Sequence, residues 1–349
     1  MRKNIRIKDI ALRAGVSIGT VDRVLHKRGE VSPETKARIQ QIIDDLDYRP
    51  NLLASSLASM KSKVFATLMP KSVSSDSYWS KPQFGVEKAM NQFKAYGVRI
   101  QQFYFEMDDS ASFSSEAEKL LLASPDGVML APWAKREALQ LTRKLDELQI
   151  PYIFIDANLQ ESNPASFVVQ SSFDSGFLAA KLIDWGVKDQ SLILLIHAAR
   201  ESDNASHLLQ RERGFMRYFE EKESNHRIIK MEISGCTDEI FTHLSDMGLD
   251  PCEVKGVFVT NSKVHLAAGC FKLKCLTPKI VGYDLIPQNI TLLKEGKIDF
   301  LICQKPELQG FHAIQLLFDF VVRKEPIRKE NYTSIDLITK ENIDFYNSL

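Results

Sequence analysis

Long hydrophobic runs are absent from this 349-residue sequence. No apolar stretch reaches the ~20 residues that a helix needs to cross a bilayer. The basic N-terminus is not followed by the apolar segment of a secretion signal. We therefore expect a protein of the cytoplasm with no membrane partner.

Cysteine is scarce, with five residues in the whole chain. The number is odd, and no two cysteines have the C-x-x-C spacing of a zinc site or a redox motif. We expect reduced thiols, as in cytoplasmic proteins, and neither a bound metal nor a cofactor. The cysteines are Cys236, Cys252, Cys270, Cys275 and Cys303.

The sequence also lacks net charge, since 45 Lys and Arg balance 45 Asp and Glu. Taken alone, this balance argues against a nucleic-acid-binding protein. The distribution of charge changes that conclusion, because residues 1–63 hold thirteen basic and only seven acidic residues. A basic segment attached to a mildly acidic body predicts that the first segment contacts DNA.

Residues 5–25 have the pattern of two short helices joined by a tight turn. Apolar residues at helical spacing make up the first helix, and Gly15 is placed to end it in a left-handed conformation. Ser17 is a suitable N-cap for the second helix, whose buried face holds Val21 and Val24. This combination predicts a helix-turn-helix, whose second helix lies in the major groove of DNA.

The second helix must bury one side and present the other to base edges. Arg23 can fork onto the two acceptors of a guanine, and Ile18 can touch a thymine methyl group. Asp22 has two interpretations: it accepts from a cytosine amine, or it pairs with a nearby basic group. The structural alternative for this segment is a small helical bundle whose charged residues are solvated and bind no DNA. The expected DNA-binding residues of this helix are Ser17, Ile18, Gly19, Thr20, Asp22 and Arg23.

A third helix is expected to begin at Ser32, with Pro33 suited to its first turn. It should end before Pro50, because a residue that precedes proline avoids the helical region. Residues 51–58 then form a helix-capable piece with Asn51 as its cap. This piece is too short to be stable alone in water, so we expect it to order only against a partner.

The run from Ile5 to Ala58 resembles the DNA-binding head of the lactose-repressor (LacI/GalR) family of bacterial transcription regulators. The motifs that carry the resemblance are Asp9-Ile10-Ala11, Ala14-Gly15-Val16-Ser17, Thr20-Val21, Arg23-Val24-Leu25, Val31-Ser32, Thr35 and Tyr48-Arg49-Pro50-Asn51. The chain departs from the family pattern at Arg6, Ile18, Gly19 and Asp22, so the operator sequence of relatives does not carry over.

This resemblance implies a helix-turn-helix domain over residues 1–49, followed by a hinge helix and linker over residues 50–62. The hinge is expected to fold when two subunits bind a palindromic operator, with Asn51 and Leu57 at the DNA. Leu57 stands where the family inserts a leucine into the minor groove, a device that bends DNA. The alternative for Leu57 is a plain core leucine.

After residue 63, short apolar runs alternate with longer amphipathic segments, and no internal repeat is visible. Strict alternation predicts an α/β body of doubly wound parallel sheets, covered by helices on both faces. About ten strands are more than one compact sheet usually holds, so we expect two lobes over residues 63–349. The expected strands are 64–69, 98–105, 127–131, 152–155, 167–169, 192–196, 228–233, 257–259, 280–282 and 300–303.

In doubly wound sheets, ligands bind at the carboxyl ends of the strands. The residues that follow the expected strands are aromatic rings, acids and amides. Hydroxyl groups need forked hydrogen bonds and sugar C–H faces lie on rings, so this set favours a polyhydroxylated ligand. The candidates are Tyr78, Trp79, Trp133, Asp156, Asn158, Asn261, Asp284 and Gln304, and His197 also follows a strand.

The body resembles, more weakly, the type I periplasmic sugar-binding fold of the same family's effector domain. Matching stretches include Arg211-Glu212-Arg213-Gly214-Phe215, Thr260-Asn261 and Val281-Gly282-Tyr283-Asp284. The resemblance implies that Arg211 holds ligand oxygens together with Asp156, Asn261, Asp284 and Gln304. We expect the chain to cross between the lobes near residues 170, 304 and 335.

The chain departs from this pattern at Ala157, where an arginine often follows the aspartate, so we expect a ligand different from familiar pentoses and hexoses. Each site residue also has a structural alternative. Arg211 could be one of several solvated charges along a helix. Asp156 or Asp284 could merely cap the segment that follows it. Trp133 and Tyr78 could pack in the core or in a subunit interface, and Trp185 is expected in the core.

These features together predict a transcriptional repressor that binds its operator as a homodimer and senses a small molecule, a sugar. We expect a ligand between the lobes to change the spacing of the two hinges. The residues are compatible with a ligand that releases DNA and with one that strengthens DNA binding. No nucleophile–base pair or phosphate-binding loop is evident, so an enzyme is not expected. The rival interpretation is a small-molecule carrier or an enzyme of the same α/β fold with an incidental helical head.

Overall fold

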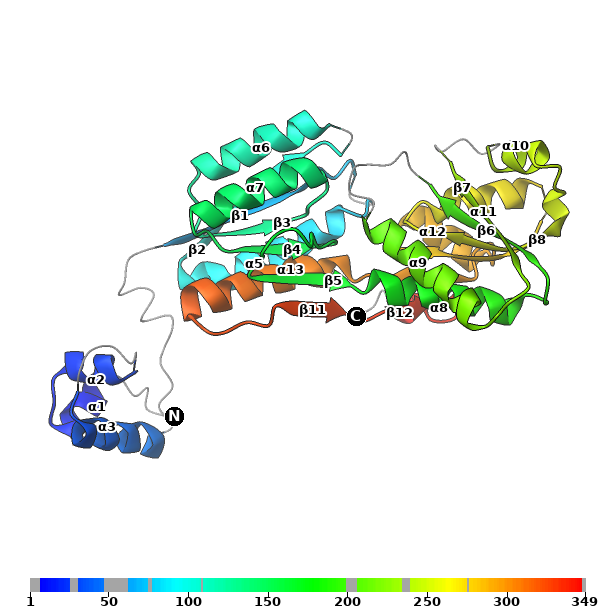
Figure 1. Cartoon of the computed structure of the whole chain (residues 1–349). Coiled ribbons are helices and arrows are strands. Elements are labelled where there is room, and N and C mark those ends of the chain that lie inside the picture. Colours follow the sequence, from blue (N-terminus) through cyan, green and yellow to red (C-terminus); the bar gives the residue numbers. More distant parts are fainter. Residues whose placement is uncertain are drawn as a thin grey trace. The chain divides into compact units, whose positions relative to one another are not determined.

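The computed structural model divides the chain into two compact units, Met1–Lys61 and Ser62–Leu349 (Figure 1). In the part of the chain that is described, no helix combines the length and the apolar character needed to cross a membrane. The structure describes residues 7–25, 31–46, 62–74, 77–107, 109–198, 206–233, 239–274 and 276–346.

The first unit contains three helices, α1 (Ile7–Ala14), α2 (Ile18–Leu25) and α3 (Pro33–Asp45). They enclose a small apolar core in which one side chain from each helix is completely buried. These side chains are Ile10, Val21 and Ile39. The core therefore uses the apolar positions that the helical spacing in the sequence predicts.

The ends of these helices are fixed by local hydrogen bonds, as predicted. Gly15 ends α1 with φ 65°, the left-handed conformation that glycine adopts without a Cβ clash. The Ser17 hydroxyl accepts a hydrogen bond from the backbone nitrogen of Thr20 at 3.2 Å. The Ser32 hydroxyl accepts from the backbone nitrogen of Thr35 at 3.4 Å. The turn that sets the angle between α1 and α2 thus depends on Gly15 and Ser17.

The second unit holds two six-stranded sheets, and every predicted strand is present. The first sheet has the order β11-β5-β4-β3-β1-β2, with β1 Lys63–Pro70, β2 Val98–Phe105, β3 Gly127–Leu130, β4 Tyr152–Ile155, β5 Ser166–Gln170 and β11 Glu330–Thr333. The second has the order β12-β10-β9-β8-β6-β7, with β6 Leu192–His197, β7 Arg227–Glu232, β8 Val254–Val259, β9 Lys279–Tyr283, β10 Phe300–Cys303 and β12 Asp336–Ile338. The predicted α/β class with doubly wound sheets in two lobes is confirmed.

Helices cover both faces of the first sheet. The helices α6 (Ser110–Leu122) and α7 (Lys135–Glu147) bury one apolar core against one face. The helices α5 (Ser80–Phe93) and α13 (Pro306–Leu317) bury another core against the opposite face (Figure 1). Because α13 comes from the far end of the sequence, the first lobe is built from two separate stretches of chain.

The second sheet is covered in the same manner. The helices α8 (Ser172–Gly186) and α9 (Ser206–Glu221) pack on one face. The helices α10 (Glu239–Asp246), α11 (Val264–Leu273) and α12 (Pro287–Lys294) pack on the other. Shorter segments are the 3-10 helices at 94–96 and 251–253, the π-helical turn at 318–323 and α14 (Ile343–Tyr346).

Trp185 is not in the core, which corrects the expectation from the sequence. Its ring is 71% exposed at the end of α8, and the Lys181 ammonium lies 5.0 Å from the ring centroid. The apolar stripe of α8 is instead supplied by smaller residues such as Ala179 and Ile183, which are fully buried. Trp185 sits one position beyond the buried Asp184, where the helix face turns outward.

The chain passes between the two sheets three times, after β5, after β10 and after β11. The buried side chain of Gln170 joins these crossings, since its amide nitrogen donates to the carbonyl of Cys303 at 2.9 Å and to that of Ser334 at 3.1 Å. Strand β12 is antiparallel to β10, a departure from all-parallel sheets. Strand β12 starts where the chain enters the second sheet, whereas β10 ends where the chain leaves it, so the two strands run in opposite directions.

The two lobes repeat one helix arrangement that is not visible in the sequence. Gly176 of α8 lies so close to α9 that a Cβ would stand 1.9 Å from the Arg211 carbonyl oxygen. Gly310 of α13 lies equally close to α5, with a Cβ position 2.2 Å from the Pro82 carbonyl oxygen. Any larger residue would force the helices apart, so these glycines set the distance between paired helices in both lobes.

Candidate functional site

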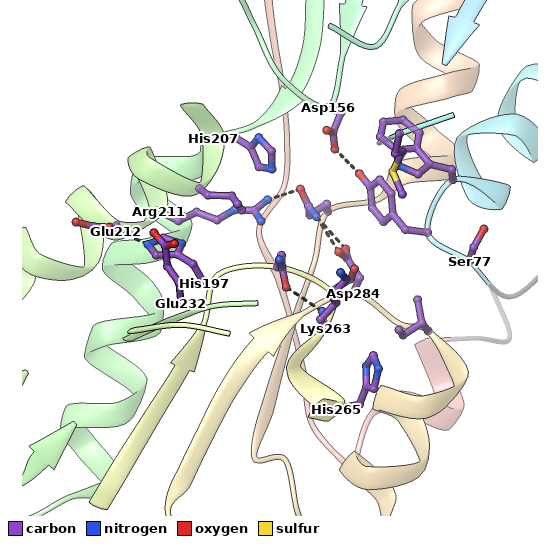
Figure 2. A pocket seen from close by; sticks show the side chains of 18 of the residues that line it. Ser77, Asp156, His197, His207, Arg211, Glu212, Glu232, Lys263, His265 and Asp284 are labelled. Carbon is purple, nitrogen blue, oxygen red and sulfur yellow. Dashed lines mark hydrogen bonds and ion pairs between the residues drawn. The ribbon is translucent and has the colours of Figure 1, made fainter. Parts of the chain in front are cut away.

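A cavity of about 930 Å³ lies between the two lobes, at the carboxyl ends of both sheets. Figure 2 shows Asp156 on one side of this cavity and Arg211 and Asp284 on the other. The cavity lining includes nearly all the ligand-binding candidates that the sequence suggests. These are Tyr78, Trp79, Trp133, Asp156, Arg211, Asn261, Asp284 and Gln304.

Asn158 is the exception, because it does not line the cavity. Asp156 adopts φ 69°, and the nitrogen of Ala157 bonds back to the Ile155 carbonyl oxygen at 2.8 Å. Asp156 lines the cavity at this tight turn, and Asn158, two residues later, does not. The side-chain oxygen of Asn158 is buried away from the cavity lining.

Arg211 lies at the centre of the second lobe's side of the cavity and is only 2% exposed. Its two terminal nitrogens donate to the Thr260 carbonyl oxygen at 2.6 Å and to the Gln304 side-chain oxygen at 2.5 Å. Its guanidinium carbon lies 3.8 Å from the ring centroid of Tyr283, which is a close cation–π contact. The alternative of a solvated helical charge is therefore excluded for Arg211.

Gln304 connects Arg211 to Asp284. Its amide nitrogen donates to both carboxylate oxygens of Asp284, at 3.0 and 2.9 Å. The pKa of Asp284 is raised to about 7, chiefly by burial and to a smaller extent by the charge of Asp156, against the lowering effects of Arg211 and Gln304. Asp284 is thus a carboxyl that exchanges its proton near neutral pH, in direct contact with the cavity.

The first lobe contributes Asp156 and a group of aromatic rings. The Tyr78 hydroxyl donates to the Asp156 carboxylate at 2.7 Å, and burial raises the pKa of Tyr78 well above its usual value. The rings of Trp79 and Trp133 meet edge to face at 6.2 Å between centroids, and the Trp133 indole nitrogen donates to the Met107 carbonyl oxygen. Rings and a carboxylate in this arrangement suit the C–H face and the hydroxyls of a sugar.

Asp156 and Asp284 occupy matching positions in the two lobes. Each directly follows a strand, β4 or β9, and each has φ 69°. A left-handed conformation is costly for a residue with a side chain and is retained mainly where the surrounding structure enforces it. Both carboxylates are therefore held at the cavity by the backbone, not by freely rotating loops.

Sequence reasoning named His197 after a strand, but it did not identify the charged partners that lie beside it in the cavity lining. His197, which ends β6, lies 2.9 Å from the Thr260 hydroxyl and 2.8 Å from the Glu212 carboxylate. Burial raises the pKa of Glu212, but hydrogen bonds from Lys230 and His197 bring it below its usual value. Glu212 directly follows Arg211 on α9, yet nothing in the local sequence separates it from a solvated helical carboxylate.

The DNA-binding candidates of the head lie on α2 or, in the case of Ser17, directly before it. Val21 and Val24 point into the head's core, while Gly19 and Arg23 are exposed and Ile18 is 56% exposed. The other candidates on this helix are half-buried or engaged at its N-terminus, namely Ser17, Thr20 and Asp22. The hinge candidates Asn51 and Leu57 lie outside the described residues.

The fold and the site define a chain with a helix-turn-helix head and a periplasmic-binding-protein-like body. Residues 65–325 match the periplasmic binding protein domain family, and residues 6–51 match the bacterial regulatory proteins of the lacI family. A solved structure from Bacteroides fragilis, assigned to the LacI transcriptional regulators, is 31% identical with a TM-score of 0.75. That alignment covers 82% of this chain and 100% of the other. The chain belongs to the LacI family.

A curated relative supports the same assignment, and a further solved structure supports the fold. The HTH-type transcriptional regulator MalR of Streptococcus pneumoniae is 29% identical over 174 residues, 49% of this chain and 52% of MalR. The match thus spans about half the length of this curated relative. GanP of Geobacillus stearothermophilus, a glucose-galactose binding protein, is 19% identical with a TM-score of 0.69, covering 81% of this chain and 99% of GanP. At that identity the likeness shows the fold alone.

Proposed function

We propose that this protein is a transcriptional repressor whose affinity for operator DNA is controlled by a sugar bound between the lobes. The observation that carries the proposal is the exposed face of α2, with Ile18 and Arg23 outward and Val21 and Val24 buried. This helix belongs to a chain whose body encloses a cavity lined by aromatic, acidic and amide side chains. The proposed action is reversible binding of both partners, with neither catalysis nor a cofactor.

At the DNA, two copies of the chain are proposed to bind a palindromic operator. Arg23 reads a base edge, while Ser17 and Thr20 place the start of α2 against phosphate. Residues 50–62 serve as the hinge, with Asn51 at its start and Leu57 inserted into the minor groove. This arrangement requires a homodimer in the cytoplasm, where the operator is, and no membrane partner.

At the ligand site, hydroxyl groups are proposed to bind Arg211, Asp284 and Gln304 from the second lobe and Asp156 from the first. GanP, with the same body fold, is a glucose-galactose binding protein, which favours a sugar here. A ligand that touches both lobes favours one degree of closure over another. A tenfold change in operator affinity needs about 1.4 kcal/mol of difference in ligand affinity between the two closures.

A gel-shift assay with DNA from upstream of the protein's own gene tests the proposal. The full chain should shift this DNA at nanomolar concentration, and the shift should weaken steeply with salt because phosphate contacts release counterions. Arg23→Ala should abolish the shift, whereas Arg143→Ala, an exposed residue on α7, should not. Failure of the chain to bind any upstream fragment at low ionic strength would overturn the proposal.

A further inference from the structure

Among the described residues, four carboxylates line the interlobe cavity, namely Asp156, Glu212, Glu232 and Asp284, and its one deeply buried cation is Arg211. The terminal nitrogens of Arg211 bond the Thr260 carbonyl and the Gln304 amide, so they do not pair with either aspartate. Among the described residues, no ion pair includes Asp156 or Asp284. Asp284 is buried and Asp156 is half-buried, and buried carboxylates are normally paired, so these two side chains lack a cation in direct contact.

On the side of the first lobe, no described cation lines the cavity. Among the described lining residues from this lobe, Asp156 is the only charged one, and the rest are aromatic, apolar or hydroxyl side chains. The lining of the second lobe, by contrast, includes three cations, Arg211, Lys230 and Lys263, beside its three carboxylates. Lys230 is already paired with Glu212. The charges in the cavity are thus divided unevenly between the two lobes.

A small recess beside Asp156 has aromatic walls, but it has no room for a water-sized group, so a ligand would lie at its mouth in the main cavity. Trp79 and Trp133 form two of its sides, Ala157 forms part of its lining, and His207 from the second lobe completes it. The Tyr78 hydroxyl already occupies one oxygen of Asp156, and no described residue hydrogen-bonds the other oxygen. A carboxylate beside aromatic rings is the setting in which proteins bind organic ammonium groups, because ring faces attract cations.

We propose that the ligand is a sugar or polyol that carries one protonated amino group, with this group bound at Asp156 beside the Trp79–Trp133 recess. Its hydroxyls would then lie at Arg211, Gln304 and Asp284. This inference rests on the proposed function and narrows its ligand class. An ammonium group has donors only, which matches the acceptor that Asp156 presents, and it supplies the direct ion pair that no described side chain makes with Asp156.

The electrostatics of Asp284 agree with this assignment. Burial is the main cause of its raised pKa, but the charge of Asp156 acts in the same direction, so the two carboxylates repel each other across the cavity. A neutral ligand would leave that repulsion in place. A cation at Asp156 relieves it and favours the ionised form of Asp284, which is the better acceptor for ligand hydroxyls.

The test compares matched probes on the full chain at pH 7 by thermal shift and isothermal titration calorimetry. The amines are 2-amino-2-deoxy-D-glucose, 2-amino-2-deoxy-D-galactose and 1-amino-1-deoxy-D-glucitol. The neutral partners are D-glucose, D-galactose, D-glucitol and the N-acetyl forms of the amines. At least one amine should bind about tenfold or more tightly than its neutral partners, the expected gain from a charge-assisted hydrogen bond.

Two variants separate charge from shape. Asp156→Asn keeps the size of the side chain and removes its charge, so the advantage of the amine should disappear. Glu118→Gln removes an exposed carboxylate on α6, away from the cavity, and should leave the advantage intact. If Asp156→Asn fails to fold, salt dependence of the wild-type chain replaces it: raising NaCl from 50 to 500 mM should weaken amine binding and leave neutral sugars unaffected.

Neutral sugars that bind as tightly as the amines, or a panel in which no amine raises the melting temperature, would overturn the inference. An amine advantage that survives Asp156→Asn would also overturn it. Failure of the proposed function is a separate result, because it shows as the absence of a gel shift with upstream DNA. A chain that shifts DNA and binds only neutral sugars would keep the proposed function and lose this inference.

Discussion

Gln309 accepts a hydrogen bond from the backbone nitrogen of Asp156 at 2.8 Å. Its amide nitrogen also donates to the Gln304 carbonyl oxygen at 3.0 Å, and the residue is 1% exposed. Gln304 follows β10, at one of the crossings between the lobes, and its side chain holds Arg211 and Asp284. One buried amide therefore joins the ligand-facing aspartate of the first lobe, a crossing segment and the hydrogen-bond network of the second lobe.

Replacement of Gln309 should uncouple ligand binding from lobe closure. Gln309→Met keeps the volume but leaves the Asp156 nitrogen and the Gln304 carbonyl without this partner, at a cost of about 1–3 kcal/mol in the free energy of unfolding. Urea unfolding measures this cost. Gel shifts with and without the tightest-binding sugar should show a smaller effect of the sugar on operator affinity.

The matched control for Gln309→Met is Gln315→Met, on the same helix and half-buried but away from the cavity. It should change neither the response to sugar nor, by more than about 0.5 kcal/mol, the stability. Equal effects of the two substitutions on the sugar response would show that Gln309 has no special role in coupling.

Arg211→Lys should weaken sugar binding at least tenfold in isothermal titration calorimetry. The guanidinium bonds Thr260 and Gln304 with two separate nitrogens while it stacks on Tyr283, and an ammonium group cannot reproduce this flat, forked geometry. Arg217→Lys, on the exposed side of the same helix, should leave the affinity unchanged. Wild-type affinity of the Arg211→Lys variant would contradict the central position given to Arg211.

The raised pKa of Asp284 predicts a pH dependence of stability with a definite sign. In the unfolded chain the carboxyl titrates at its ordinary value of 3.8, and in the folded chain at about 7. Between these values the folded state binds more protons, so the contribution of Asp284 to stability is largest at acidic pH. This contribution falls as the pH rises towards 7 and stays low above it.

Other groups titrate over the same range, so the measurement is a difference. The free energy of unfolding of the wild type minus that of Asp284→Asn should fall by up to a few kcal/mol between pH 5 and pH 8. Urea unfolding at intervals of half a pH unit gives this curve. A difference that is constant across the range would show that Asp284 titrates normally in the folded protein.

The sequence predicted those parts of the fold that have a local signal. Apolar runs identified the strands, and residues placed directly after them, such as Asp156 and Asp284, line the cavity. Strands β11 and β12 were missed because they are short, and Glu330–Thr333 carries no apolar run. Gln309 and Glu212 were missed because they lie on helices, where a polar residue that faces a partner has the same local pattern as one that faces water.

Gly176 should control the position of Arg211, although it never touches the cavity. A Cβ at this position would stand 1.9 Å from the Arg211 carbonyl oxygen, so Gly176→Ala must push α9 away from α8. We expect a loss of about 1–3 kcal/mol in unfolding free energy, typical of overpacking, together with weaker sugar binding in calorimetry. Gly269→Ala is the control, because the position on α11 is open within 4 Å and alanine favours helix. If both alanine variants bind sugar like the wild type, the close helix contact does not set the position of the arginine.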